Sequence, residues 1–393
     1  MKENKFKNLV DIFWVATKLG LTSFGGPQAH LGYFHAEYVK KRKWIDDKSY
    51  ADLMALAQFL PGPSSSQVGI GVGSARGGVL GGIMAFLGFT WPSALILTLF
   101  AHFAQSLDAS THTWLNGLRI VSLAIVLHAA LGMATKLTPD KKTKAIALGA
   151  LVTLLVWPTR FTQVIILTVA GILGLICFKT PLHVEGKNTA FNVSKTFGTT
   201  CLALFFMLLI ALPLITAHLD QQWLNLFNPI FRSGALVFGG GHVVLPLLEA
   251  EFVPTGLMAS DVFLAGFGLT QAMPGPLFTF AAYIGTVMNG ILGALIGIGA
   301  IFLPGILLLY GCLPFWDALR RNALIKRALM GLNAAVVGTL LAAFYQPIWM
   351  HSIFNPVDFA LFALLFALLA YWKLPPWIVV VAGAIGGFLI GMF

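Results

Sequence analysis

The sequence predicts an all-α polytopic membrane protein: two inverted-topology repeats with broken or re-entrant helices, joined by one extra transmembrane helix. The first observation is composition, because 58% of the 393 residues are apolar and 10% are charged, whereas about a quarter of a soluble domain is charged. The second observation is a long internal repeat. The third is a set of Pro and Gly breaks that recur at matching places in both copies of the repeat.

Long apolar stretches supply the predicted spans. Val79 to Phe103, Thr196 to Ala217 and Gly290 to Leu309 are examples, and each can cross a hydrocarbon core of roughly 30 Å as a helix. Such stretches leave no room for a large soluble domain. The first apolar stretch contains Lys18 and ends in Phe-Gly-Gly-Pro rather than in a small-residue cleavage site, so we do not expect a signal peptide.

The net charge of +10 raises the alternative of a nucleic-acid partner. The basic residues are confined to loops between spans, so we interpret them as setting orientation in the lipid bilayer and expect no nucleic acid. Cys177, Cys201 and Cys312 stand singly in apolar surroundings, which predicts no disulfide. His30 and His35 lack the spacing of metal ligands on one helix face, and we expect no metal or cofactor.

The internal repeat is carried by motifs in constant register. Phe24 to Pro27 (FGGP) recurs as Phe238 to Gly241 (FGGG), and Pro61-Gly62-Pro63 recurs as Pro274-Gly275-Pro276. The offset stays between 212 and 214 positions along the whole unit, which chance does not explain. The predicted segments are a first repeat (residues 1–178), a linker with one transmembrane helix (179–220) and a second repeat (221–393).

The inversion follows from the linker helix, Thr196 to Ala217, which has no counterpart in either repeat. If each repeat crosses the membrane an even number of times, this helix turns the second repeat upside down. Charge placement agrees, because the basic cluster Lys40 to Lys43 is matched by Glu249 to Asp261, which contains no Lys or Arg. Arg160 is the exception. We expect the N-terminus in the cytoplasm.

Each predicted element of the first repeat follows from this topology. Leu9 to Phe24 enters the membrane, breaks at the FGGP motif and returns, and a second such hairpin breaks at PGP and brings Arg76 back. Val79 to Phe103 then crosses outward, and Leu115 to Thr135 crosses back. In the second repeat, Ile291 to Leu309 is the corresponding crossing toward the cytoplasm.

The four breaks predict half-helix ends near the middle of the membrane. Pro lacks an N–H group and Gly permits a sharp reversal, but non-helical backbone is tolerated there only inside protein or beside a watery cavity. New helices begin after each PGP, at Ser64 to Gln67 and at Leu277 to Thr279. Their free N–H groups and partial positive charge, with the serine hydroxyls, suit a tetrahedral dianion.

The candidate substrate-binding residues are the glycines of the breaks, the polar side chains beside them and two cations placed alike in the repeats: Lys18, Gly25, Gly26, Gln58, Gly62, Ser64, Ser65, Ser66, Gln67, Arg232, Gly239, Gly240, Gln271, Gly275 and Thr279. Glu37 and Glu251 are repeat-matched candidates for ion coupling, since no carboxylate lies deep in an apolar span. Structural alternatives stay open. The breaks could be kinks or packing points, the cations could snorkel to headgroups, and the serines could cap a helix.

Several motifs together carry a family resemblance. They are FGGP at Phe24 to Pro27, AEYV and WIDD within Ala36 to Asp47, QFLPGPSSSQ at Gln58 to Gln67, the glycine-rich stretch Gly69 to Gly82, and a weaker second copy from Phe238 to Pro304. With these motifs the sequence resembles the chromate ion transporter family in its long two-domain form. The resemblance implies a bacterial inner-membrane protein that exports chromate and confers resistance, with sulfate as a competing substrate. The second copy departs from the first at Gly241 and at Leu277 to Thr279, which shifts more of the expected site to the first repeat.

The predicted mechanism is alternating access around an oxyanion site at the midplane. The alternative is a channel or exchanger for sulfate or another oxyanion rather than a dedicated chromate exporter. An intramembrane enzyme would need a nucleophile with a base, or a metal cluster, and the predicted spans contain neither. A scaffold gives no reason for matched breaks. The coupling ion and the oligomeric state, including a homodimer, stay open.

Overall fold

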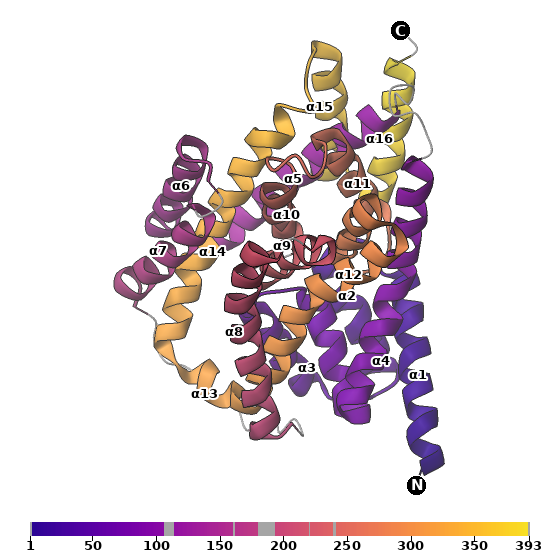
Figure 1. Cartoon of the computed structure of the whole chain (residues 1–393), viewed down its shortest axis with the longest axis vertical. Helices are drawn as coiled ribbons and strands as arrows, with labels where there is room; N and C mark the ends of the chain where they lie inside the picture. Colours follow the sequence, from indigo (N-terminus) through magenta and orange to yellow (C-terminus); the bar gives the residue numbers. More distant parts are fainter. Residues whose placement is uncertain are drawn as a thin grey trace. The chain divides into compact units, whose positions relative to one another are not determined.

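The computed structural model describes residues 2–105, 114–159, 162–179, 193–219, 221–238 and 241–391. These residues form helices and connecting turns and contain no strand, which confirms the predicted all-α class (Figure 1). Arg160, Gly239, Gly240 and most of the polar stretch before Lys195 lie outside the described residues.

The helices of the first half of the chain, in order, are α1 (Lys2–Thr22), α2 (Gly26–Phe34), a π-helical segment (His35–Lys41), α3 (Asp47–Phe59), α4 (Ser64–Gln105), α5 (Trp114–Leu137), α6 (Lys141–Val156) and α7 (Thr162–Cys177). Those of the second half are α8 (Lys195–His218), α9 (Gln222–Leu236), α10 (Val244–Phe252), α11 (Ser260–Ala272), α12 (Phe280–Cys312), α13 (Trp316–Arg321), α14 (Ala323–Ala343), α15 (Pro356–Ala370) and α16 (Pro376–Ile390). Short 3-10 turns at Gly241–Val243, Leu277–Thr279 and Leu313–Phe315 and a π-helical segment at Phe344–Trp349 complete the set.

Several of these helical stretches are long and apolar enough to cross a membrane, which confirms a polytopic membrane protein. In the described part of the chain five qualify: Ser64–Phe103, Trp114–Leu137, Lys195–His218, Leu277–Arg321 and Ala323–Gln346. They include the predicted crossings of the first repeat, the linker helix and the predicted crossing near Ile291 to Leu309. Shorter apolar helices are Thr162–Cys177, Pro356–Ala370 and Pro376–Ile390.

All four predicted breaks interrupt helices at the expected residues. In the first half, α1 ends at Thr22 and α2 begins at Gly26, with Gly25 at φ 93° and Gly26 at φ 78°; α3 ends at Phe59 before α4 begins at Ser64. In the second half, α9 ends before the FGGG motif, and α11 ends before the PGP motif and the turn Leu277–Thr279. Positive φ is the backbone region that glycine adopts at least cost, so Gly25 and Gly26, Gly62 and Gly275 set the interruptions at FGGP and at the two PGP motifs.

The predicted topology reverses the chain between Arg76 and Val79, and the structure has a turn there and another at the corresponding residues of α12. Backbone torsions leave the helical range at Gly77 and Gly78 inside α4, and at Asn289 and Gly290 inside α12, with φ of 66° at Gly78 and 60° at Gly290. Each of these long helices is therefore two arms joined by a tight turn. The arms touch through glycines, because a Cβ on Gly73 would meet the backbone of Gly81 and one on Gly285 would meet that of Gly293.

The chain forms two compact units, and each takes segments from both halves of the sequence. Unit 1 consists of Met1–Ser106, Gly186–Val244 and Met273–Ala318; unit 2 consists of Leu107–Glu185, Leu245–Ala272 and Leu319–Phe393. All four breaks fall in unit 1. Helix α10, which follows the FGGG motif, and helix α11, which precedes the second PGP motif, belong almost wholly to unit 2. The division of the sequence into two repeats and a linker stays a prediction.

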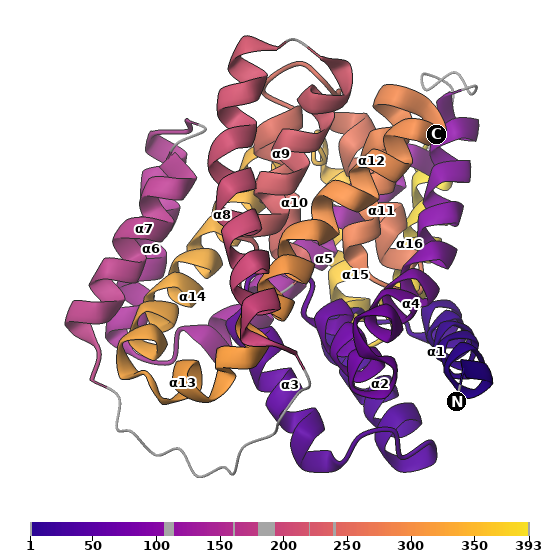
Figure 2. The ribbon, with the colours of Figure 1, turned by 60° about the horizontal axis from the view of Figure 1, so that its bottom comes forward.

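Within unit 1, α4 and α12 form the centre. Helix α1 packs along α4, as both views show, while α9 and α8 pack against α12 (Figures 1 and 2). Glycine permits the closest approach, since a Cβ on Gly20 of α1 would lie 2.6 Å from the carbonyl oxygen of Phe89 in α4. The polar candidates on α1, α4 and α9 are thereby positioned on tightly packed helices.

Within unit 2, α14 packs against α6 and α7, and α5 packs against α11, α15 and α16 (Figure 2). Small residues again line the contacts, because Gly338 and Gly331 of α14 face the backbone of α6 and α7 at Ala147 and Ala170. The hydroxyl of Ser122 in α5 donates to the Leu264 carbonyl of α11 at 2.9 Å. An interhelical bond of this kind satisfies a polar group away from water.

Candidate functional site

The breaks of the two sequence halves are joined by two matching backbone hydrogen bonds within unit 1. The Gly62 N–H donates to the Val237 carbonyl at 2.8 Å, and the Gly275 N–H donates to the Ser23 carbonyl at 2.9 Å. Gly62 and Gly275 are the central residues of the two PGP motifs, and Ser23 and Val237 each precede a glycine-rich break. Each PGP motif is therefore bonded to the glycine-rich break of the other half.

The central glycines of both PGP motifs are required by their surroundings. Gly62 has φ 113°, and a Cβ there would lie 3.1 Å from the Cα of Gly305. Gly275 has φ 97°, and a Cβ there would lie 2.9 Å from Ser93 Oγ. Ser93 and Gly305 follow the helix prolines Pro92 and Pro304, so each long helix presents the residue after its proline to the PGP motif of the other half.

Helix α4 begins with the serine run directly after the first of these glycines. Its first N–H groups have no acceptor within the helix, as at any helix N-terminus. Gln67 is fixed in place because its Nε2 donates to the Pro61 carbonyl at 3.0 Å and to the Gly305 carbonyl at 3.2 Å. Ser65 Oγ lies 3.3 Å from Nδ1 of His30. Ser66 Oγ and Gln67 Oε1 are buried and have no partner among the described residues.

Other buried hydroxyls in unit 1 also lack a partner among the described residues. They are Ser23 Oγ at the end of α1, Thr90 Oγ1 in α4 and Ser233 Oγ in α9. Leaving such a group without a partner costs about 1 to 3 kcal/mol. Each of these hydroxyls is therefore a position where a polar ligand or a water molecule would be stabilised.

The structure brings most of the predicted substrate-binding residues into unit 1, with different exposure. Ser65, Ser66, Gln67, Gly62, Gly275 and Thr279 are buried; Ser64, Gly26 and Arg232 are half-buried; Lys18, Gly25 and Gln58 are exposed. The Thr279 hydroxyl donates to the Pro276 carbonyl at 2.7 Å. Gln271 and Glu251 belong to unit 2, and Gly239 and Gly240 lie outside the described residues. The role of these residues in binding stays a prediction.

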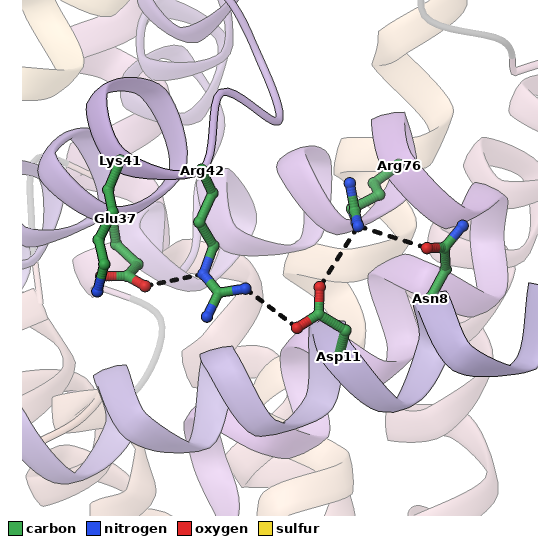
Figure 3. Close-up of polar contacts among 6 residues, drawn as sticks. All are labelled: Asn8, Asp11, Glu37, Lys41, Arg42 and Arg76. Carbon is green, nitrogen blue, oxygen red and sulfur yellow. Dashed lines mark hydrogen bonds and ion pairs between the residues drawn. The ribbon is translucent and has the colours of Figure 1, made fainter. Parts of the chain in front are cut away.

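Glu37, a predicted coupling residue, belongs to a network of charged side chains in unit 1 (Figure 3). Its Oε1 accepts from Arg42 Nε at 2.8 Å and its Oε2 from Lys41 Nζ at 3.2 Å. Arg42 Nη1 also donates to Asp11 Oδ1 at 3.0 Å, and Arg76 Nη2 reaches Asp11 Oδ2 at 3.4 Å. The network ties the segment after α2 to α1 and to the turn inside α4.

The network keeps Glu37 ionised. Burial acts to raise the pKa of this carboxyl, but the hydrogen bonds from Arg42 and Lys41 outweigh burial, and the pKa lies below its ordinary value. The positive charge of Lys18 acts in the same direction. A carboxyl that carries protons in transport needs a pKa near the working pH, so the coupling role of Glu37 stays a prediction without support from this geometry.

Unit 2 contains a cavity of about 410 Å³ whose lining includes Glu249, Gln163, Gln346 and His351. Burial raises the pKa of the Glu249 carboxyl to about 7. The sequence pointed to Glu251 through its repeat match, whereas Glu249, two residues earlier, is the acid on this cavity. Residues two apart on a helix face different directions, so Glu249 and Glu251 cannot both face this cavity. The repeat match alone does not indicate which of the two acids does.

The comparisons with known proteins extend along nearly the whole chain. The family described as "Chromate transporter" matches residues 10–175 and again residues 224–388. An uncharacterized transporter of Methanocaldococcus jannaschii is 27% identical over 87% of this chain and 85% of its own length. A probable chromate transport protein of Synechococcus elongatus is 29% identical (94% and 92%), and a chromate transport protein of Pseudomonas aeruginosa is 26% identical (95% and 90%). No solved structure matches the chain significantly.

Proposed function

Because the chain belongs to the chromate transporter family, we propose that it carries chromate, or a similar tetrahedral dianion such as sulfate, out of the cell. The proposed setting is a bacterial inner membrane with the N-terminus in the cytoplasm. The proposed substrate site is the part of unit 1 where the PGP motifs meet the glycine-rich breaks.

The observation that carries this proposal is the pair of hydrogen bonds from Gly62 to Val237 and from Gly275 to Ser23. The first bond lies beside the start of α4 and the second beside the turn Leu277–Thr279, and both join interrupted backbone from the two halves. A dianion that leaves water needs several donors in its place, and helix N-terminal N–H groups provide donors and a partial positive charge. Ser66 Oγ, buried and without a partner among the described residues, is the side-chain donor that we assign to the anion.

Neutral donors suit transport because the substrate must also leave. A site that binds an ion too tightly does not release it, so carriers and channels need interactions of moderate strength. In this proposal the hydroxyl and N–H groups hold the anion, and the half-buried Arg232 of α9 supplies positive charge from the second half. Lys18, exposed on α1, acts nearer the network around Glu37, whose pKa it helps to lower.

The proposed mechanism is alternating access, in which the joined breaks are exposed to one side of the membrane at a time. Inverted repeats give such a site two equivalent arrangements that face opposite sides. An interior-negative potential favours export, since moving one charge through 100 mV is worth about 2.3 kcal/mol and a dianion carries two charges.

The test is uptake of labelled chromate by energised everted vesicles, with unlabelled sulfate as competitor. We expect saturable uptake that sulfate inhibits, and a fall of roughly ten- to a hundredfold in kcat/KM for Ser66→Ala, because a hydrogen bond to a charged group contributes about 1.5 to 3 kcal/mol. Thr199→Ala is the matched control, since Thr199 is exposed on α8 and its hydroxyl donates to the Thr196 carbonyl of the same helix. Equal kcat/KM for Ser66→Ala and Thr199→Ala at equal membrane levels would place the site elsewhere.

Counter-transport separates a carrier from a channel. Vesicles preloaded with unlabelled chromate should take up labelled chromate faster than empty vesicles if the protein alternates between two states. Flux that neither saturates nor responds to preloading would contradict alternating access.

A further inference from the structure

Unit 1 contains a second feature suited to anions, a cavity of about 1080 Å³ beside the turn inside α4. Three cationic side chains, Lys5, Lys43 and Arg76, line it, together with the backbone from Gly77 to Leu80. Asp46 and Asp47 line it as well. Whether the cavity attracts anions therefore depends on which of these charges are already neutralised by other groups.

The two acids of the lining are engaged in local structure. Asp46 caps α3, because its Oδ1 accepts from the backbone N–H groups of Lys48 and Ser49 at 3.1 and 3.0 Å, and its Oδ2 accepts from Ser49 Oγ at 2.7 Å. Asp47 Oδ1 lies 2.7 Å from His35 Nε2. A capping carboxylate is compensated by the helix N-terminus, so these acids offset the cations of the cavity only in part.

The cations have donors to spare. Lys5 and Lys43 make no ion pair with any described residue. Arg76 makes two long contacts from one nitrogen, Nη2, at 3.4 Å to Asp11 and at 3.4 Å to Asn8, and its buried Nε has no partner among the described residues. The neighbouring Arg42, by contrast, makes contacts of 2.8 and 3.0 Å.

Arg76 is also held in a fixed orientation. Its guanidinium lies 4.5 Å from the ring centre of Trp44, and Trp44 stacks on Tyr38 with 5.3 Å between ring centres. Because the guanidinium is planar, this contact sets the direction of its N–H groups. The second arm of α4 starts directly after Gly78, so its first N–H groups also border the cavity and lack acceptors within the arm.

We propose that this cavity is a second anion site, in which Arg76, Lys43 and Lys5 bind a small inorganic oxyanion on its way to or from the joined breaks. The inference rests on the proposed function for the substrate class. Arg76 exchanges its long contacts with Asp11 and Asn8 for a two-pronged contact with the oxyanion, which is the geometry that arginine favours. The second repeat has Met288 at the position of Arg76, so the site belongs to the first repeat alone.

Two substitutions at one ion pair separate ligand binding from structural support. Arg76→Gln and Asp11→Asn both remove the ion pair between these side chains, and Asp11→Asn also removes the ion pair between Asp11 and Arg42. If Arg76 only supports the fold, both variants impair the protein in the same direction. If Arg76 binds the anion, Arg76→Gln raises the KM for chromate in everted vesicles at least about tenfold, whereas Asp11→Asn frees Arg76 and lowers the KM. A shift of KM in the same direction in both variants would overturn the inference.

A second pair of variants controls for net charge. Lys43 lines the cavity, while Lys48 is exposed close by in sequence and is not part of the lining. Lys43→Gln should raise the KM a few-fold, and Lys48→Gln should leave it unchanged. Equal effects of Lys43→Gln and Lys48→Gln would mean that general surface charge, rather than this cavity, attracts the substrate.

Direct binding distinguishes failure of this inference from failure of the proposed function. Sulfate is titrated into the purified full-length protein in detergent, with isothermal calorimetry as the readout. Binding that Arg76→Gln removes and Ser66→Ala leaves intact supports the cavity even if the protein does not transport chromate. Sulfate binding that is unchanged in Arg76→Gln overturns the cavity site while leaving the transport proposal intact.

Discussion

Glu37 illustrates how local helix geometry creates a charge contact. The segment His35–Lys41 is π-helical, and its wider turn places residue i+5 over residue i. Arg42 therefore lies on the same face as Glu37, and both its backbone N–H and its Nε donate to that residue, to the carbonyl at 2.9 Å and to Oε1 at 2.8 Å. Lys41, four residues after Glu37, binds the second carboxylate oxygen.

We predict that Glu37→Gln weakens the acid sensitivity of the fold. The pKa of Glu37 is lowered from 4.5 in the folded protein, so its contribution to stability is present above the unfolded pKa and is lost as the pH falls through the folded pKa. The thermal midpoint in detergent should fall for the native sequence as the pH drops from 7 to below about 4. Glu37→Gln should start lower at pH 7 and fall less. Parallel pH profiles would contradict this account.

At the scale of elements, the two long helices α4 and α12 are each folded back on themselves. The turn residues Gly78 and Gly290 have positive φ, and the arms meet through glycine pairs that leave no space for a side chain. In α4 the turn carries Arg76 to the lined cavity, and the hydroxyl of Ser74 before it bonds that of Tyr310 in α12 at 2.8 Å. The close packing of the two arms of α4 therefore fixes the position of Arg76 at the cavity.

We predict that Gly285→Ala destabilises the protein and that Gly299→Ala does not. A Cβ on Gly285 would collide with the backbone of Gly293 across the hairpin, whereas a Cβ on Gly299 of the same helix meets open space. Overpacking of this kind costs about 1 to 3 kcal/mol. The measurement is the thermal midpoint of each purified variant in detergent. If the thermal midpoints of Gly285→Ala and Gly299→Ala were equal, the two arms of α12 could move apart without a loss of stability.

At the scale of the whole molecule, unit 1 is completed by segments from both halves of the sequence. Ser23, which precedes the FGGP motif, is bonded to the PGP motif of the second half, and Val237, which precedes the FGGG motif, is bonded to the PGP motif of the first half. Such reciprocal contacts are what two related repeats make when they pack face to face. The predicted inversion, in which the two repeats enter the membrane from opposite sides, is open to a direct test.

We predict that Lys40 and Leu257 face opposite sides of the membrane. Both side chains are exposed, and they lie on the matching segments whose charge differs between the halves. Lys40→Cys and Leu257→Cys are introduced singly after the three native cysteines are replaced by Ala. An impermeant maleimide added to intact cells should label Leu257→Cys, and added to everted vesicles it should label Lys40→Cys. Labelling of both from one side would rule out inverted repeats.

The breaks could be predicted from the sequence because their causes are local. Pro61 and Pro63 lack an N–H group, and Gly25 and Gly62 adopt positive φ, so a helix stops there whatever surrounds it. Charge placement, rather than a proline, predicts the reversal between Arg76 and Val79, and the structure places its turn at Gly77 and Gly78.

The charged network around Asp11 could not be predicted in the same way. Arg42 and Arg76 lie 31 and 65 residues from Asp11 along the chain, and the sequence indicated only that this region carries many charges. Arg42 binds both Glu37 and Asp11, and Asp11 makes only a long contact with Arg76. This arrangement depends on how α1 packs along α4. Charge pairs at such separations have no local signature.

By itself the sequence determined that this protein is helical and membrane-embedded, and it determined where its helices stop, because hydropathy, proline and glycine act through the residues immediately around them. Only the tertiary structure decided that Gly62 bonds Val237, that Gly275 bonds Ser23 and that Arg76 faces a cavity. These contacts join segments far apart in the chain, and their geometry follows from the packing of whole helices rather than from the preference of any one residue.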